Sequence, residues 1–278
     1  MRLSTVCVAG RSAFGPVTDE HLADISGVFP DLAAALAEGP AAIAAAAVGA
    51  PSVALADATF DLPIPNPRRI LCVGLNYAAH RAESSAPQSA TDHPAIFVRF
   101  PSSLCGHDQP IVRPHVSTAF DYEGELAIVI GSTCRYVSPE TALEFVAGYS
   151  LFMDGTLRDF QRHTSQFTPG KSFERSGGFG PWIVTPDEFD AATAELTTTV
   201  SGIVRQHAPI SDMIHDVAGI VSYCSQWTAL EPGDVIATGT PSGVGYARDP
   251  QVLLAPGDVV EVTITGLGTL RNHVIDEA

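Results

Sequence analysis

The pattern of apolar positions along the chain predicts a protein built mainly of short β-strands. Most apolar runs are short, rich in valine and isoleucine, and end at glycine or proline. Predicted strands lie at residues 3–9, 70–73, the first part of 93–103, 121–131, 183–184, 196–204, 235–238, 259–264 and 270–275. Helical patterns are fewer and lie at residues 31–36 and 41–48, after Asn76 as a cap, and at 211–227 after a serine cap.

The predicted strand at 121–131 begins with three carboxylates, those of Asp121, Glu123 and Glu125. Alternation along a strand places Glu123 and Glu125 on one face, which continues as the apolar residues Ala127 and Val129. Two half-desolvated like charges roughly 7 Å apart repel and take up protons unless a cation lies between them. Such an oxygen-only pair favours Mg²⁺, with Mn²⁺ or Ca²⁺ as alternatives. The other interpretation is a strand end whose glutamates face water.

The run at residues 62–67 contains three prolines and predicts a stiff connector between two parts of the chain. Residues 1–66 form a predicted small N-terminal accessory domain, and residues 67–278 form the predicted catalytic domain. The N-terminal part shows no constellation of polar residues, so we expect it to have a structural or interface role.

Composition and charge exclude several classes of partner. The formal net charge of −16 argues against nucleic acid and anionic membranes as partners. The alanine-rich segment at 33–50 is interrupted by Glu38 and Pro40, which leaves fewer than the roughly 20 apolar residues of a membrane span. Five scattered cysteines without a C-x-x-C spacing are typical of reduced, mostly buried thiols. We therefore expect a cytoplasmic protein.

His80 and Glu83 are three residues apart on the helix predicted after residue 76, so they are neighbours on one helical face. A carboxylate beside an imidazole fixes the tautomer and raises its basicity, as a general base that acts on water requires. A surface ion pair is the alternative explanation.

Asp154, Arg158 and Gln161 have the spacing of one helical face, after a segment at 142–153 that mixes helix and strand signals. A carboxylate, a guanidinium and an amide together suit a site that binds both a cation and an anionic substrate. A helix salt bridge between Asp154 and Arg158 is the competing explanation. Lys171 after Gly170 lacks the spacing of a phosphate-binding loop, whereas the glycine-rich loop at 239–245 can bring backbone N–H groups close to an anion.

Taken together, these segments resemble the fumarylacetoacetate hydrolase family. The resemblance covers roughly residues 68–277 and rests on five motifs in the family's order: VGLNYAAHRAE, FDYEGELAIVIG, VAGYSLFMDGTLRDFQ, GKSFERSGGFGPWIVT and GDVIATGTPSGVG. It implies an α+β fold, predominantly mixed β, with a β-roll C-terminal domain behind a small N-terminal domain. It also implies a homodimer that binds a divalent cation.

The resemblance further assigns residues to roles. It places metal ligands on Glu123, Glu125 and Asp154, and a water-activating histidine with its carboxylate partner on His80 and Glu83. It places charge stabilisation of the reacting substrate on Lys171. Substrate-binding positions fall on Arg158, Gln161 and Thr240.

The sequence therefore predicts a metal-dependent hydrolase that cleaves a carbon–carbon bond in an acylpyruvate or related β-diketo acid. The alternatives are an oxaloacetate decarboxylase or keto-acid tautomerase or isomerase, and a metal-binding protein without catalysis. We also expect a lid at residues 77 to about 92. The distal pocket for the acyl group is predicted from Tyr77, the loop at 100–101 and the N-terminal region.

Overall fold

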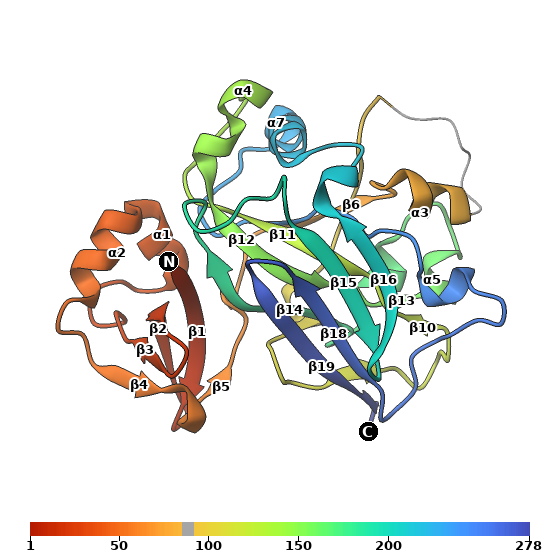
Figure 1. Cartoon of the computed structure of the whole chain (residues 1–278), viewed down its shortest axis with the longest axis horizontal. Coiled ribbons are helices and arrows are strands. Elements are labelled where there is room, and N and C mark those ends of the chain that lie inside the picture. The colour runs from red at the N-terminus through yellow and green to blue at the C-terminus, as the bar shows by residue number, and fades with distance from the viewer. Residues whose placement is uncertain (85–91) are drawn as a thin grey trace.

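The computed structural model describes residues 1–84 and 92–278 of the chain. In this part of the chain, mixed β-sheet predominates over helix, as the sequence predicts (Figure 1). A twelve-stranded sheet runs in the order β4-β3-β2-β1-β14-β12-β11-β17-β6-β7, with β5 beside β1 and β8 beside β14. A five-stranded sheet, β16-β15-β18-β19-β9, packs against it, and β10 pairs with β13.

The strands are β1 Arg2–Val8, β2 Arg11–Val17, β3 His21–Ala23, β4 Ser52–Ala54, β5 Thr59–Phe60, β6 Ile70–Gly74, β7 Ala95–Val98, β8 Leu104–Cys105, β9 Ile111–Arg113, β10 Phe120–Asp121, β11 Gly124–Ile130, β12 Val146–Met153, β13 Thr156–Leu157, β14 Gly177–Val184, β15 Glu195–Val200, β16 Ile203–Pro209, β17 Val235–Ala237, β18 Val259–Ile264 and β19 Gly268–Asp276. The α-helices are α1 Leu32–Glu38, α2 Pro40–Ala47, α3 Ala78–Glu83, α4 Pro139–Ala142, α5 Arg158–Gln161, α6 Thr168–Lys171 and α7 Val217–Trp227. The 3₁₀ helices are η1 Leu55–Asp57, η2 Pro101–Ser103, η3 Leu143–Phe145, η4 Ile210–Asp212 and η5 Gly245–Ala247.

The N-terminal strands and the helices α1 and α2 lie together on one side of the molecule (Figure 1). Strand β1 pairs with β14, so the main sheet is continuous from this region into the rest of the chain. Asp31 caps α1 by accepting a hydrogen bond from the Ala34 N–H, which explains where the helix begins. The division of the chain at residue 66 stays a prediction.

The central strand β11 is buried on both faces, and its two faces belong to different hydrophobic clusters. Leu126 and Ile128 pack into the core that the two large sheets share with α7. Ala127 and Val129 pack on the opposite face, into the cluster that includes residues of β1 and α1. Because side chains alternate along the strand, Glu125 shares this second face, as the sequence predicts.

The two large sheets approach each other closely at Gly124, the first residue of β11. A Cβ atom built on Gly124 would lie 2.1 Å from the Thr198 hydroxyl oxygen on β15. The buried amide of Gln206 on β16 accepts a hydrogen bond from the Gly124 N–H at 3.0 Å and donates to the Thr240 hydroxyl at 2.8 Å. The start of β11 is therefore held directly on the five-stranded sheet.

Three sequence predictions about element boundaries are wrong. The strand predicted at 196–204 is a hairpin, because Ser201 and Gly202 adopt positive φ values of 50° and 79° and reverse the chain. The helix predicted at 211–227 begins only at Val217, where the Asp216 side chain accepts the cap hydrogen bond from the Gly219 N–H. The strand predicted at 121–131 is interrupted between β10 and β11.

The five cysteines are all free thiols, and four of them are buried, as the sequence predicts. Within the described residues, no helix is long and apolar enough to cross a membrane.

Candidate active site and metal centre

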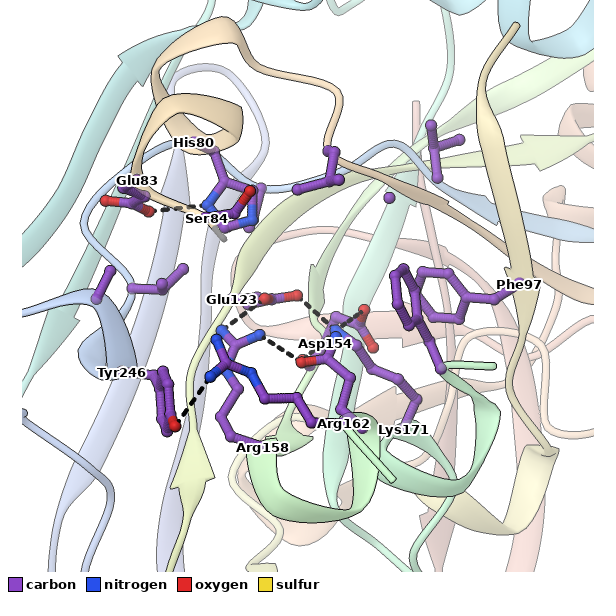
Figure 2. Close-up of a pocket in the computed structure, with 18 of the residues that line it drawn as sticks. His80, Glu83, Ser84, Phe97, Glu123, Asp154, Arg158, Arg162, Lys171 and Tyr246 are labelled. Carbon is purple, nitrogen blue, oxygen red and sulfur yellow. Dashed lines mark hydrogen bonds and ion pairs between the residues drawn. The ribbon is translucent and has the colours of Figure 1, made fainter. Parts of the chain in front are cut away.

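A cavity of about 420 Å³ brings together all nine residues to which the sequence analysis assigned a site role. His80 and Glu83 come from α3, and Arg158, Gln161 and Lys171 come from α5 and α6 on another wall. The carboxylates of Glu123 and Asp154 lie between these walls (Figure 2), and Glu125 also lines the cavity. Thr240 lines it from the loop after β17.

The pairing of β11 with β12 determines the position of the three carboxylates. The register places Gly124 opposite Met153, and the Asp154 N–H donates to the Glu123 carbonyl at 2.8 Å. One carboxylate oxygen from each of Glu123, Glu125 and Asp154 lies within 4.8 Å of the other two. All three residues are buried, with at most 5% of their surface exposed.

Over residues 1–84 and 92–278, basic side chains contact Glu123 and Asp154, but none forms an ion pair with Glu125. Lys171 Nζ lies 2.5 Å from Glu123 and 2.6 Å from Asp154, and Arg158 lies 2.7 Å from Glu123. Burial alone would raise the pKa of Glu123, but Lys171 and Arg158 outweigh this effect and lower it to about 2. Burial, together with the charges of Asp154 and Glu123, raises the pKa of Glu125 well above its usual value.

This arrangement fits a divalent cation. The donors are buried carboxylate oxygens only, which hard ions such as Mg²⁺ and Mn²⁺ prefer. Among the described residues, Glu125 accepts a hydrogen bond from the Gly239 N–H at 2.8 Å but has no lysine, arginine or histidine nitrogen within 4.0 Å. A cation beside Glu125 would supply the missing positive charge.

Arg99 is a residue of this site that the sequence analysis did not assign. It follows β7, is 2% exposed, and donates to Asp154 Oδ1 at 2.5 Å and to the Gly155 carbonyl at 2.9 Å. Hydrogen bonds to Ser103 and Ser176 hold its other nitrogens. Arg99 thus fixes the orientation of the Asp154 carboxylate. An arginine after an apolar run was the only signal in the sequence.

The predicted pair of His80 and Glu83 is present on α3. His80 Nδ1 lies 2.8 Å from Glu83 Oε1, and the Gly243 N–H donates to both Glu83 oxygens at 2.9 and 3.1 Å. The glycine-rich loop therefore supports the dyad through its backbone. Asn76 does not cap α3 as predicted, because its side chain bonds His215 and the Thr238 carbonyl instead.

The helical face predicted for Asp154, Arg158 and Gln161 is only partly correct. The strand β13 separates Asp154 from α5, and Asp154 pairs with Arg99 and Lys171 rather than with Arg158. Arg158 donates to Gln161 at 3.0 Å and to Asp121 at 2.8 Å. Asp121, which the sequence analysis did not assign a role, also accepts from the Gly245 and Tyr246 N–H groups.

The Thr240 hydroxyl is committed to the protein, since it donates to the Gly124 carbonyl at 2.9 Å and accepts from Gln206. A hydroxyl carries a single hydrogen, which the Gly124 carbonyl already accepts. The predicted substrate-binding role of Thr240 therefore falls to its backbone N–H.

Comparison with known proteins identifies the family of this chain. The sequence model described as "Fumarylacetoacetate (FAA) hydrolase C-terminal" matches residues 69–275. The chain belongs to the fumarylacetoacetate hydrolase family. It is 39% identical to a 2,4-didehydro-3-deoxy-L-rhamnonate hydrolase of Sphingomonas sp. (strain SKA58), over 92% of this chain and 89% of that protein.

Two further members of the family are informative. The oxaloacetate tautomerase YisK of Bacillus subtilis (strain 168) is 38% identical over 79% of this chain and 74% of that one. The maleylpyruvate hydrolase of Sphingobium sp. SYK-6, solved in complex with manganese (II) ion and pyruvate, has a TM-score of 0.83 and 29% identity over the whole of both chains. The fumarylacetoacetate hydrolase family thus includes both hydrolases and tautomerases among the relatives of this chain.

The predicted lining of the distal pocket for the acyl group is wrong. Tyr77 is 2% exposed and Phe100 is 55% exposed, and neither they nor the N-terminal region line the cavity. The described outer walls are instead formed by Phe97, Phe167 and Tyr246, together with residues such as Arg162 and Thr164 that the sequence analysis did not assign. The predicted lid at 77 to about 92 falls partly on residues 85–91, which lie outside the described residues.

Proposed function

We propose that this protein is a divalent-metal-dependent hydrolase that cleaves the carbon–carbon bond of an acylpyruvate or a related β-diketo acid. The observation that carries the proposal is the combination, in one cavity, of a buried three-carboxylate cluster with a His–Glu pair on another wall. Two relatives of this chain are named as hydrolases, which supports the proposal. The proposed cation is Mg²⁺, with Mn²⁺ as the alternative that the maleylpyruvate hydrolase structure supports.

Glu123, Glu125 and Asp154 would hold the cation, which supplies Lewis-acid polarisation of the substrate's keto group. Glu83, fixed by the Gly243 N–H, holds the proton on His80 Nδ1 and so leaves Nε2 as the base. His80 Nε2 then removes a proton from the water that attacks the distal carbonyl. The same nitrogen can return the proton to the departing pyruvate carbon.

Negative charge develops on the attacked oxygen, and the cations on another wall stabilise it. Lys171 Nζ has three N–H donors, of which two are used by Glu123 and Asp154 at 2.5 and 2.6 Å. Its third contact, to the Asp154 carbonyl at 3.4 Å, is long, so this donor can turn to substrate at little cost. Arg158 and Gln161 line the same wall and would orient the acid end of the substrate.

Keto–enol tautomerisation of a keto acid is the second candidate, because YisK is an oxaloacetate tautomerase. That reaction, like oxaloacetate decarboxylation, requires no attacking water. A panel of acylpyruvates and oxaloacetate, followed by ultraviolet absorbance and by product analysis, separates the three reactions. Release of pyruvate and a free acid supports the hydrolase, whereas enolisation or loss of carbon dioxide alone supports the rivals. The small keto-acid substrate and the homodimer both stay predictions; sedimentation velocity tests the latter.

A further inference from the structure

The cavity holds one arginine that the proposed mechanism does not use. Arg162, at the C-terminal end of α5, lines the cavity and is exposed, whereas Arg158 one turn earlier is buried. Arg158 and Lys171 are each held by two carboxylates. In the described part of the chain, by contrast, no carboxylate oxygen lies within 4.0 Å of the Arg162 guanidinium. Arg162 is therefore a positive charge on the cavity wall without an acidic partner.

The Arg162 side chain is nevertheless held in place. Its Nη1 donates to the Tyr246 hydroxyl at 3.0 Å, and its guanidinium lies 4.2 Å from the centre of the Tyr246 ring (Figure 2). Both contacts come from a single tyrosine, so the guanidinium keeps further N–H donors for a ligand. A planar, pre-positioned fork of donors is the group that proteins use to bind a carboxylate in two-point contact.

Asp121 connects this arginine–tyrosine pair to Arg158, which is proposed to orient the acid end of the substrate. Its Oδ2 accepts from Arg158 Nε at 2.8 Å and from the Tyr246 N–H at 3.0 Å. Asp121 is fully buried, so it holds the two elements in a fixed relation. The position of Tyr246, and through it that of Arg162, is thus built into the same framework as the proposed acid-binding group Arg158.

We infer that Arg162 and Tyr246 form a second anion subsite, which binds a carboxylate at the far end of the substrate. The substrate class is then a 2-keto acid with two carboxylates, not one with a neutral or hydroxylated tail. This inference rests on the proposed function for the keto-acid end only. It adds a residue pair that sets specificity and takes no part in bond cleavage.

Arg135 and Tyr136 provide a matched control outside the cavity. Arg135 lies 4.0 Å from the Tyr136 ring centre and donates to the Tyr136 hydroxyl at 2.8 Å, so it repeats both contacts of the Arg162–Tyr246 pair. Neither residue lines the cavity. Arg135→Gln and Tyr136→Phe therefore make the same chemical changes on the surface without touching the site.

Binding of non-cleavable probes tests the inference independently of turnover. The probes are 2-oxoglutarate and 2-oxoadipate, compared with 2-oxopentanoate, 2-oxohexanoate and 6-hydroxy-2-oxohexanoate, which match them in length but lack the second carboxylate. Titration calorimetry uses the full-length protein with saturating Mg²⁺ or Mn²⁺. We expect the better dicarboxylate to bind about five- to thirtyfold more tightly than its matched monoacids, the range of a charge-assisted contact at a partly exposed site.

Arg162→Gln should abolish this preference, Tyr246→Phe should reduce it, and the two control variants should keep it. A wild-type protein that binds the hydroxylated or monoacid probes as tightly as the dicarboxylates overturns the inference. So does an undiminished preference in Arg162→Gln. If the preference follows Arg162 but no acylpyruvate is cleaved, the subsite stands and the proposed hydrolase function falls. If acylpyruvates are cleaved and the preference is absent, the hydrolase stands and the subsite falls.

Discussion

Buried carboxylates lie near both ends of the central strand β11, and they serve different purposes. At one end, Glu125 joins Glu123 and Asp154 on the floor of the cavity. Beyond the other end, Asp234 precedes β17 and is fully buried, and its main-chain carbonyl accepts from the Ile130 N–H. Asp234 does not line the cavity, and its Oδ2 accepts hydrogen bonds from the Glu231 N–H and Arg69 at 2.8 and 2.9 Å.

The difference lies in the number of acids for each cation and in access. Asp234 is a single carboxylate held by Arg69, which also lies 3.9 Å from the Glu231 carboxylate, and by the Glu231 N–H of the turn that it caps. The cluster at the other end has three converging carboxylates, and it opens on a cavity. One of these carboxylates has no counter-ion in the part of the chain that the structure describes. Burial of an acid is therefore common to both sites, and it is the convergence of like charges on a cavity that points to chemistry.

The largest effect is expected for the His80–Glu83 pair in the cavity. His80→Ala and Glu83→Ala should each lower the hydrolytic rate by about 10²- to 10⁴-fold, the usual contribution of a general base. The double variant should lose little more than the worse single one, since both residues serve one role. Steady-state kinetics with an acylpyruvate measures this. Near wild-type turnover in His80→Ala would refute the water-activation mechanism but not the metal site.

The next effect separates the two acid sites directly. Glu125→Gln should weaken Mg²⁺ or Mn²⁺ binding by on the order of 10²-fold or more, because it removes a full charge from a site selected by charge and geometry. Asp234→Asn changes the same group at the other end and should leave the affinity unaltered. Titration calorimetry on both variants decides the comparison. An equal loss of metal affinity in the two variants would contradict the assignment of the metal site to the Glu125 end of β11.

Asp234→Asn should instead lower the free energy of unfolding, by about 1–3 kcal/mol, since it weakens the hydrogen bonds that Asp234 Oδ2 accepts from Arg69 and from the Glu231 N–H. Burial raises the pKa of Asp234 as it raises that of Glu125, so the two sites differ in these partners and not in the direction of the pKa shift. Glu125→Gln should not destabilise the metal-free protein at neutral pH, because it removes a buried charge that lacks a counter-ion. Urea unfolding of both variants after chelation measures these opposite effects. A large destabilisation by Glu125→Gln without metal would contradict the charge argument.

The smallest expected effect is the release of a proton from Glu125 when the metal binds. Burial and the charges of Asp154 and Glu123 raise the folded-state pKa of Glu125 above its usual value of 4.5. A raised folded-state pKa means that the stabilising contribution is fully present below 4.5 and is lost as the pH rises through the folded-state value. Metal binding below that value should release a proton, and apparent affinity should rise by up to about tenfold per pH unit. Calorimetry in two buffers of different ionisation enthalpy counts the protons; Glu125→Gln should show no such release.

The sequence predicted the part of the site that depends on local order. Alternation along one strand placed Glu125 beside Ala127, and three-residue spacing on a helix joined His80 to Glu83. The family resemblance added Lys171 and the role of Asp154 as a metal ligand, because the partners of both residues are distant in the chain.

What the sequence did not predict depends on tertiary pairing. Arg99 reaches Asp154 across 55 positions, and Asp121 reaches Tyr246 across 125, and no local pattern encodes such distances. The supposed helix from Asp154 to Gln161 failed because β13 pairs with β10 and takes up the first residues of that segment. Tyr77 was predicted to line the distal pocket, but the fold buries it in a bridge with Met213.

Gly124 lies between two of the proposed ligands and has no side chain to offer. Even one methyl group there would collide with Thr198 on the facing sheet. In a saturation-mutagenesis survey, positions 123 and 125 should be intolerant because of their charge, and position 124 because of its volume. The survey should therefore record an unbroken intolerant block of three positions, where an ordinary strand shows tolerance at every second position. A transplant of the two glutamates into another protein would fail unless the recipient brings its own sheet this close behind them.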